Sequence, residues 1–189
     1  MKKIILASAS PRRRELLAGL DIEFEVDTRN TFEESIDPSL EAHEVPAAMA
    51  EGKSEGFWRE LSEDEILITA DTVVIIDGKV LGKPHSREEA FSMLQTLSGR
   101  THEVVTSVVI RSCSRKTAFS DSTLVTFAPL SDDDINYYID KYKPFDKAGA
   151  YGVQEWIGYA GIMRLEGSYF NVMGFPVARV REALLQEPD

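Results

Sequence analysis

The chain has 189 residues, of which 43% are hydrophobic and 28% charged, a balance typical of a globular protein with a sizeable core. Its formal net charge of −11 argues against a generic nucleic-acid binder, which needs positive charge to neutralise phosphates. The single cysteine, Cys113, excludes an intramolecular disulfide framework and a zinc ribbon. No apolar stretch approaches the roughly 20 residues of a membrane helix, so we expect a cytoplasmic protein that does not bind membranes.

The first third of the chain predicts one strand and two helices. Residues 4–7 are apolar and predict a short buried strand. Ser10 is a suitable N-cap and Pro11 a suitable first helical residue, which predicts a helix to about Leu20. A second helix is expected from Pro46 to about Leu61, although it contains two glycines, which are poor helix formers.

The middle of the chain predicts a hairpin and a capped helix. Residues 66–76 are mostly apolar and β-branched, as in a buried strand. Asp77-Gly78 is a two-residue hairpin signal, after which residues 79–81 return as a second strand. Ser86 and Glu89 then form a capping box for a helix that ends near Leu97.

The second half predicts strands and helices without a strict alternation. Strands are expected at 104–110 and 123–127, and a helix capped by Ser131 is expected to reach about Tyr142. Two late strands should flank Gly167-Ser168, and a last helix should begin at Pro176. Because the order lacks a strict βαβ rhythm, we expect an α/β protein with a mixed sheet.

The segment Ser8-Ala9-Ser10-Pro11-Arg12-Arg13-Arg14 places three cations at a predicted helix N-terminus. The helix dipole makes a cation there unfavourable by about 0.3–1 kcal/mol. The arrangement is reasonable if an anion lies in front of the helix, where serine hydroxyls and free amides complete a phosphate site. Alternatively, the arginines point outward and pair with some of the 32 acidic residues. The segment alone does not choose between these interpretations.

Asp71 interrupts an apolar strand, where an unpaired carboxylate would be costly to bury. It indicates either a catalytic or metal-binding carboxylate in a cleft, or a strand-end residue bonded to nearby amides. Lys83 follows the hairpin, and either returns to the same cleft or lies in a solvated loop. In the later segment Asp146–Gln154, small residues allow a ligand close to the backbone, and Gln154 can read a base edge. A glycine-containing loop before a strand is also common without such a role.

Six segments in register resemble the Maf family over nearly the whole chain. Phe175, where the family usually has Leu, is a minor apolar departure. The six segments are Leu6–Arg13, Ala70–Val74, Gly82–Pro84, Leu97–His102, Asp146–Gln154 and Tyr169–Pro176.

The resemblance implies one domain over residues 1–189 with a fold related to the inosine triphosphate pyrophosphatases. That fold is an elongated mixed β-sheet flanked by helices, with two lobes and a central cleft. The implied activity is hydrolysis of the α–β phosphoanhydride of a nucleoside triphosphate, giving the monophosphate and pyrophosphate. The resemblance also implies a divalent cation, Mg²⁺ or Mn²⁺, and often a homodimer.

The resemblance also implies roles for individual residues. Asp71 would be the proton acceptor, and Asp71 and Glu33 are the candidates for holding the metal. Substrate choice would be set by Arg12, Thr72 and Gln154. The triphosphate would be contacted by Arg13, Lys53 and Lys83.

Thr72 directly after Asp71 indicates the branch of the family that takes dTTP and UTP, with modified pyrimidine nucleotides as further candidates. The branch that takes 7-methylguanosine triphosphate has Gln at this position and is one alternative. A nucleotide-binding regulator of cell division without turnover is another, and it would have no need for Asp71. A small-molecule phosphatase is a third, and it would release orthophosphate instead of pyrophosphate.

Overall fold

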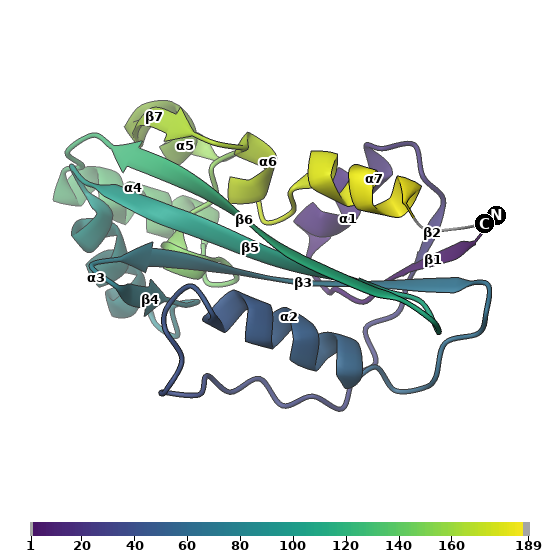
Figure 1. The fold of residues 1–189 in the computed structure, drawn as a ribbon. Helices are drawn as coiled ribbons and strands as arrows, with labels where there is room; N and C mark the ends of the chain where they lie inside the picture. The colour runs from purple at the N-terminus through teal and green to yellow at the C-terminus, as the bar shows by residue number, and fades with distance from the viewer. Residues whose placement is uncertain (1, 187–189) are drawn as a thin grey trace. The chain divides into compact units, whose positions relative to one another are not determined.

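The computed structural model describes residues 2–186. Its strands form one sheet in the order β2-β1-β3-β5-β6-β7, with β4 paired to β3 (Figure 1). The strands are β1 (Lys3–Leu6), β2 (Phe24–Val26), β3 (Glu65–Ile76), β4 (Lys79–Leu81), β5 (Thr101–Arg111), β6 (Lys116–Phe127) and β7 (Ile162–Glu166). The helices are α1 (Pro11–Ala18), α2 (Val45–Glu55), α3 (Arg87–Leu97), α4 (Asp132–Tyr142), the 3-10 turn η1 (Ala148–Ala150), α5 (Trp156–Gly161), α6 (Tyr169–Val172) and α7 (Val177–Leu185).

Strand directions are mixed within this sheet. β1 pairs in parallel with both β2 and β3, whereas β4 runs antiparallel to β3 and β7 antiparallel to β6. Helices connect or flank these strands, so the predicted α/β class with a mixed sheet is confirmed. None of the helices in residues 2–186 is long and apolar enough to cross a membrane.

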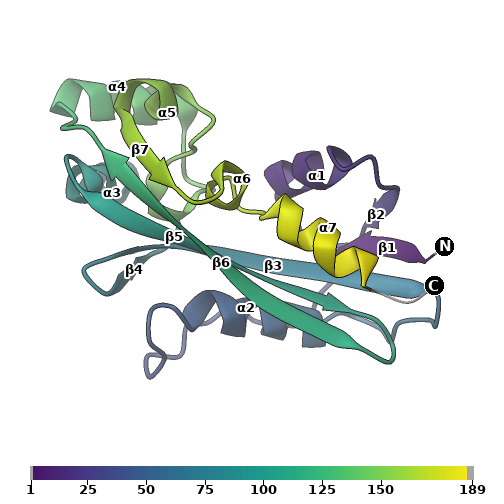
Figure 2. The same ribbon diagram turned by 45° about the horizontal axis from the view of Figure 1, so that its top comes forward.

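Contacts divide the chain into two compact units. The first comprises Met1–Asp71, Thr106–Asp121 and Gly174–Asp189; the second comprises Thr72–Val105 and Ser122–Met173. In the first unit, α2 covers one face of the strands, and α1 and α7 lie on the opposite face (Figures 1 and 2). Leu6, Leu17, Ala50, Leu67 and Ile68 have no exposed surface and form part of its core. Burial of such side chains contributes about 1.5–3 kcal/mol each for the larger ones.

In the second unit, α3 packs against α4 and against η1. Leu94 and Leu97 on α3 and Ile139 on α4 are completely buried. Tyr138 on α4 is also completely buried. The unit is therefore built around a closed helical core beside its share of the strands.

Helix caps agree closely with the sequence. Ser10 caps α1 with its side chain, and Ser131 and Asp134 form both halves of a capping box on α4. Ser86 caps α3 in the expected way, but Glu89 accepts a hydrogen bond from the His85 N–H at 2.7 Å. The reciprocal half of that box is thus displaced by one residue.

Two expectations need correction, and two short elements were not predicted. The second of the late strands, after Gly167, is wrong: Ser168 caps a short helix, α6, by accepting the Asn171 N–H. The second helix ends at Glu55 instead of Leu61, because Gly56 forms its C-cap and the Gly56 carbonyl accepts the Thr31 N–H at 2.8 Å. The strand β2 and the helix α5 were not predicted, since segments of three and six residues show little periodicity.

Candidate active site

The first turn of α1 turns one of its arginines inward. The Ser10 side chain accepts the Arg13 N–H at 3.4 Å, which begins the helix at Pro11. The Arg13 guanidinium donates from Nε to the Gly174 carbonyl at 2.9 Å and from Nη1 to Ser8 Oγ at 3.3 Å. Arg13 is half-buried, and Ser8 is buried. The Arg13 guanidinium is therefore directed at Ser8 and at the Gly174 carbonyl, and Arg12 is half-buried beside it.

Asp71 forms an ion pair inside the first unit. Its Oδ1 lies 2.7 Å from the Nζ of Lys53, which projects from the last turn of α2. Both side chains are only 17% exposed, so this pair is largely withdrawn from water. The same Nζ lies 3.1 Å from Glu34 Oε1, on a more exposed loop. One ammonium group thus lies between two carboxylates.

Arg13 interacts electrostatically with the carboxylates of Asp71 and Glu34. Burial lowers the pKa of Arg13 below its usual value, and the negative charge of Asp71 opposes that shift. A guanidinium nevertheless stays protonated in proteins. The first unit therefore gathers Arg13 and Lys53 around Asp71, which suits binding of phosphate oxygens next to a carboxylate.

Two carboxylates of the first unit, Asp71 and Glu34, are of the kind that binds a divalent cation. Among residues 2–186, no group of three or more His, Cys, Asp or Glu side chains is arranged to hold a metal. Mg²⁺ commonly binds one or two carboxylates together with substrate phosphates and water. Asp71 and Glu34, on either side of the Lys53 ammonium, fit that kind of site and not a closed protein cage. Glu33, the residue expected from the sequence, is exposed in the same loop, and no contact links it to Lys53.

The segment Asp146–Gln154 belongs to the second unit and is held against the end of β3. Gly149 has a φ of 66°, and its N–H donates to the Gly82 carbonyl at 3.0 Å. A Cβ at this position would lie 2.9 Å from a methyl carbon of Val74, so a side chain would not fit. The glycine therefore serves both the left-handed turn and the close approach to the strand.

A buried polar network fixes the same segment. Lys147 Nζ pairs with Asp146 at 2.8 Å and with Glu155 at 3.1 Å, and Lys147 is 8% exposed. The Tyr138 hydroxyl accepts the Gly152 N–H at 2.9 Å and donates to Glu155; burial, and then Glu155, raise the pKa of Tyr138. Tyr138 of α4 thus holds the segment at Gly152 and contacts Glu155, the partner of Lys147.

His102 is a buried residue that contacts this segment through Tyr151. Its Nε2 lies 2.7 Å from the Tyr151 hydroxyl, and both rings meet Phe127 edge to face. Burial lowers the pKa of His102 to about 4, so the ring is neutral at physiological pH. His102 is therefore a core residue of the second unit, bonded through Nε2 to Tyr151.

The three remaining predicted site residues also lie in the second unit. Gln154 is half-buried, and its Oε1 is buried without a hydrogen-bond partner among the described residues. Thr72 is half-buried at the first position of the second unit on β3, and Lys83 is exposed after β4. A buried acceptor without a partner costs about 1–3 kcal/mol, so Gln154 is suited to receive a ligand donor.

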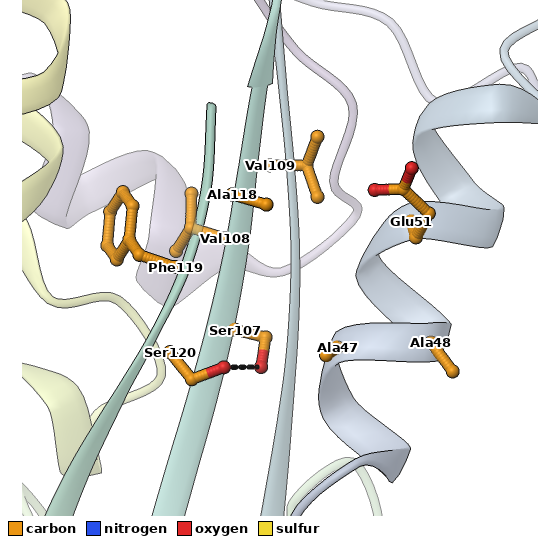
Figure 3. A pocket seen from close by; sticks show the side chains of 9 residues that line it. All are labelled: Ala47, Ala48, Glu51, Ser107, Val108, Val109, Ala118, Phe119 and Ser120. Atoms are coloured by element: carbon orange, nitrogen blue, oxygen red, sulfur yellow. Dashed lines mark hydrogen bonds between the residues drawn. The ribbon is translucent and has the colours of Figure 1, made fainter. Parts of the chain in front are cut away.

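A cavity of about 430 Å³ lies elsewhere in the first unit, between α2 and the strands β5 and β6 (Figure 3). Small side chains line most of it, and Ser107 on β5 and Ser120 on the neighbouring β6 are hydrogen-bonded to each other at 2.6 Å. Its one carboxylate, Glu51, is paired with Lys116. None of the residues predicted to handle a nucleotide lines this cavity.

Comparisons with known proteins agree with this fold. A HAM1 protein from Coxiella burnetii has a solved structure similar to this chain, with a TM-score of 0.50 and 14% sequence identity. The match covers 99% of this chain and 100% of that one. The likeness shows the architecture alone: an α/β fold shared with the HAM1 proteins.

The sequence places the chain more narrowly. The sequence model of the Maf-like protein family matches residues 3–187. A dTTP/UTP pyrophosphatase of Porphyromonas gingivalis is 55% identical over 93% of this chain and 89% of that protein. A dTTP/UTP pyrophosphatase of Parabacteroides distasonis is 50% identical, over 96% of this chain and 94% of that protein. The chain therefore belongs to the Maf family.

Proposed function

We propose that this protein hydrolyses dTTP and UTP to the monophosphate and pyrophosphate. The proposal rests on sequence identity: the chain is 50–55% identical to two proteins named dTTP/UTP pyrophosphatase, over most of each sequence. The cluster of Arg13, Lys53 and Asp71 supplies the residue types that such a reaction needs.

Phosphate binding would fall to the basic side chains of the first unit. A triphosphate carries about four negative charges, and charge-assisted hydrogen bonds to phosphate are among the strongest that proteins make. Arg13 is held in place by Ser8 and Gly174, so little side-chain freedom would be lost on binding. Arg12 and the amides at the start of α1 would add to the same anion site. Lys53 would exchange part of its contact with Asp71 for a phosphate oxygen.

Asp71 would act as the proton acceptor. A carboxylate beside the α-phosphorus can orient a water molecule and take its proton as the water attacks in line. The bond from Lys53 fixes one oxygen of Asp71 and leaves the other for water. Lys53 and Arg13, both in the first unit, would then hold the departing pyrophosphate.

We also propose that a divalent cation, Mg²⁺ or Mn²⁺, takes part. Bound with the triphosphate, it would offset the charge that develops on the leaving group. Asp71 and Glu34 are the residues that would hold it, because both carboxylates lie at the Lys53 ammonium and Mg²⁺ commonly binds one or two carboxylates together with substrate phosphates.

Base recognition would fall to the second unit. Gln154 combines an amide donor with a buried carbonyl oxygen that lacks a partner in residues 2–186. Uracil and thymine share an edge with an acceptor, a donor and an acceptor, and this edge can pair with both groups of the Gln154 amide. Thr72 would complete the choice of substrate, as its position after Asp71 predicts.

The test is a panel of nucleoside triphosphates incubated with the purified protein and Mg²⁺ or Mn²⁺, with products separated by chromatography. We expect dTTP and UTP to give dTMP, UMP and pyrophosphate. Release of orthophosphate would instead indicate a phosphatase, and binding without turnover would indicate a nucleotide-binding regulator. Faster hydrolysis of 7-methylguanosine triphosphate than of UTP would keep the reaction but contradict the assigned substrate.

A further inference from the structure

The loop that carries Glu34 is held on α2 in an unusual way. Between β2 and α2, residues 27–34 form no helix, and their one strand-like contact is the bridge between Asn30 and Phe57. Yet Glu34 reaches Lys53 at 3.1 Å. Something other than regular secondary structure must fix the path of this loop.

Hydrogen bonds from Asn30 provide the first constraint. Its side-chain amide donates to the Lys53 carbonyl at 2.6 Å, and its Oδ1 accepts the Phe32 N–H at 2.8 Å. The neighbouring Thr31 N–H donates to the Gly56 carbonyl at 2.8 Å. Lys53 is therefore held at both ends, by Asn30 at its backbone and by Glu34 at its ammonium group.

A notch in α2 provides the second constraint. Gly52 and Gly56 lie four residues apart, hence on one face of the helix. A Cβ on Gly52 would lie 2.3 Å from the Phe32 ring, and one on Gly56 would lie 2.7 Å from Phe32 Cβ. The Phe32 ring thus occupies the space of the missing side chains. The helix accepts a glycine cost of about 1 kcal/mol at position 52 and gains this contact.

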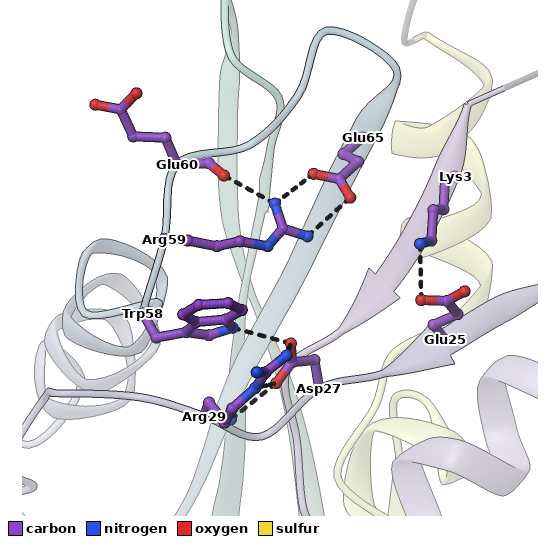
Figure 4. A network of polar contacts seen from close by, with 8 residues as sticks. All are labelled: Lys3, Glu25, Asp27, Arg29, Trp58, Arg59, Glu60 and Glu65. Carbon is purple, nitrogen blue, oxygen red and sulfur yellow. Dashed lines mark hydrogen bonds and ion pairs between the residues drawn. The ribbon is translucent and has the colours of Figure 1, made fainter.

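The start of the loop is anchored separately (Figure 4). The Arg29 guanidinium bonds both oxygens of Asp27 at 2.9 and 2.7 Å and lies 3.8 Å from the centre of the Trp58 ring. The Trp58 indole also donates to Asp27 at 3.0 Å. This cluster fixes where the loop begins, and Asn30 and Phe32 fix where it goes next.

We propose that Phe32 and Asn30 are positioning residues that hold Glu34 at Lys53, next to Asp71. The inference rests on the proposed function, because it assigns these residues to the geometry of that site. Phe32 in its notch, not a helix or a strand, determines where the Glu34 carboxylate lies. A displacement of about 1 Å in such a group can lower a rate about 100-fold.

The experiment is a double-mutant cycle on the full chain. Phe32→Ala, Glu34→Gln and the double variant are compared with wild type, and Ile36→Ala is the matched control. Ile36 is an apolar residue of the same loop but is 53% exposed and lies outside the notch. Two quantities are measured: kcat and KM for UTP, and the rate at which Lys53 is acetylated without nucleotide, followed by mass spectrometry.

We expect Phe32→Ala to lower kcat by about tenfold or more, with KM changed by less than about twofold. In the Glu34→Gln background the same substitution should lower kcat by less than about twofold, since its effect runs through Glu34. Lys53 acetylation should rise to a similar level in both single variants and no further in the double variant. Gly52→Ala should reproduce Phe32→Ala, and Ile36→Ala should behave as wild type.

Equal effects of Phe32→Ala in both backgrounds would overturn the proposal, as would an unchanged rate of Lys53 acetylation. If Phe32→Ala fails to fold, Phe32→Leu, which fills part of the notch, carries the same cycle. The acetylation readout does not depend on catalysis. The expected acetylation pattern in a protein that hydrolyses no nucleotide would therefore support the positioning role and refute the proposed function.

Discussion

Replacing Asp71 by Asn separates catalysis from stability. The substitution keeps the shape of the side chain and an oxygen that can still accept the Lys53 hydrogen bond of 2.7 Å. It removes the basicity and the negative charge. Loss of a general base costs about 10²–10⁴-fold in rate, which corresponds to about 2.7–5.5 kcal/mol in the activation free energy. We therefore expect kcat for UTP to fall by about 100-fold or more.

The free energy of unfolding should change much less. Breaking a buried ion pair is costly when it leaves one charge without a partner. Here Lys53 keeps Glu34 at 3.1 Å, so its ammonium stays paired in the variant. We expect a loss of about 1–2 kcal/mol at most, measured by urea denaturation.

The assay follows pyrophosphate release from UTP with Mg²⁺, and Asp77→Asn is the control. Asp77 lies just beyond the end of β3, is well exposed and pairs with Arg100 at 2.6 Å. The same chemical change there should leave kcat within about twofold, because exposed ion pairs contribute little. Near-normal turnover by a correctly folded Asp71→Asn protein would refute the assignment of Asp71 as the base.

Three further predictions concern other parts of the molecule. Arg13→Ala should cost about 1–3 kcal/mol in transition-state stabilisation, seen as a lower kcat/KM for UTP; an unchanged value would exclude contact with the triphosphate. The kcat/KM for UTP should exceed that for CTP by about 5- to 150-fold, because the mismatch between cytosine and the Gln154 amide costs about 1–3 kcal/mol. Gln154→Ala should reduce this ratio of kcat/KM values in competition assays. Arg59 lowers the pKa of Glu65 to about 2 (Figure 4), so the stability from this depressed pKa is present above the unfolded value near 4.5 and is lost as pH falls through 2. Unfolding free energies of wild type and Glu65→Gln should therefore differ at pH 7 and converge near pH 2.

The sequence predicted the long elements, and the structure brings three of the predicted site residues, Arg13, Lys53 and Asp71, together in the first unit. The run at 66–76 and the caps at Ser10 and Ser131 carry their own local signals, and the structure has them at nearly the same boundaries. Asp71 was identified because a carboxylate in an apolar strand is costly, and the structure shows it paired with Lys53. Local chemistry is sufficient in these cases.

Contacts between distant segments could not be predicted in this way. Which of Glu33 and Glu34 lies at Lys53 depends on the path of a loop without periodicity, and Asn30 and Phe32 of that loop contact α2. The role of Gly52 could not be predicted from the sequence either. In the sequence it weakens the prediction of a helix, whereas in the structure it makes room for Phe32. A local rule is broken at this position because a tertiary contact needs the space.

The net charge of −11 and a triphosphate substrate are reconciled by where the cations lie. An acidic surface repels an anion at long range, and salt screens that repulsion beyond about 8–10 Å. Arg13 is half-buried and Lys53 is 17% exposed, so both act in a medium of lower dielectric constant than water. Their attraction for a phosphate is therefore strong at short range and little weakened by salt. Two partly buried cations beside Asp71 can therefore bind a triphosphate that the protein as a whole would repel.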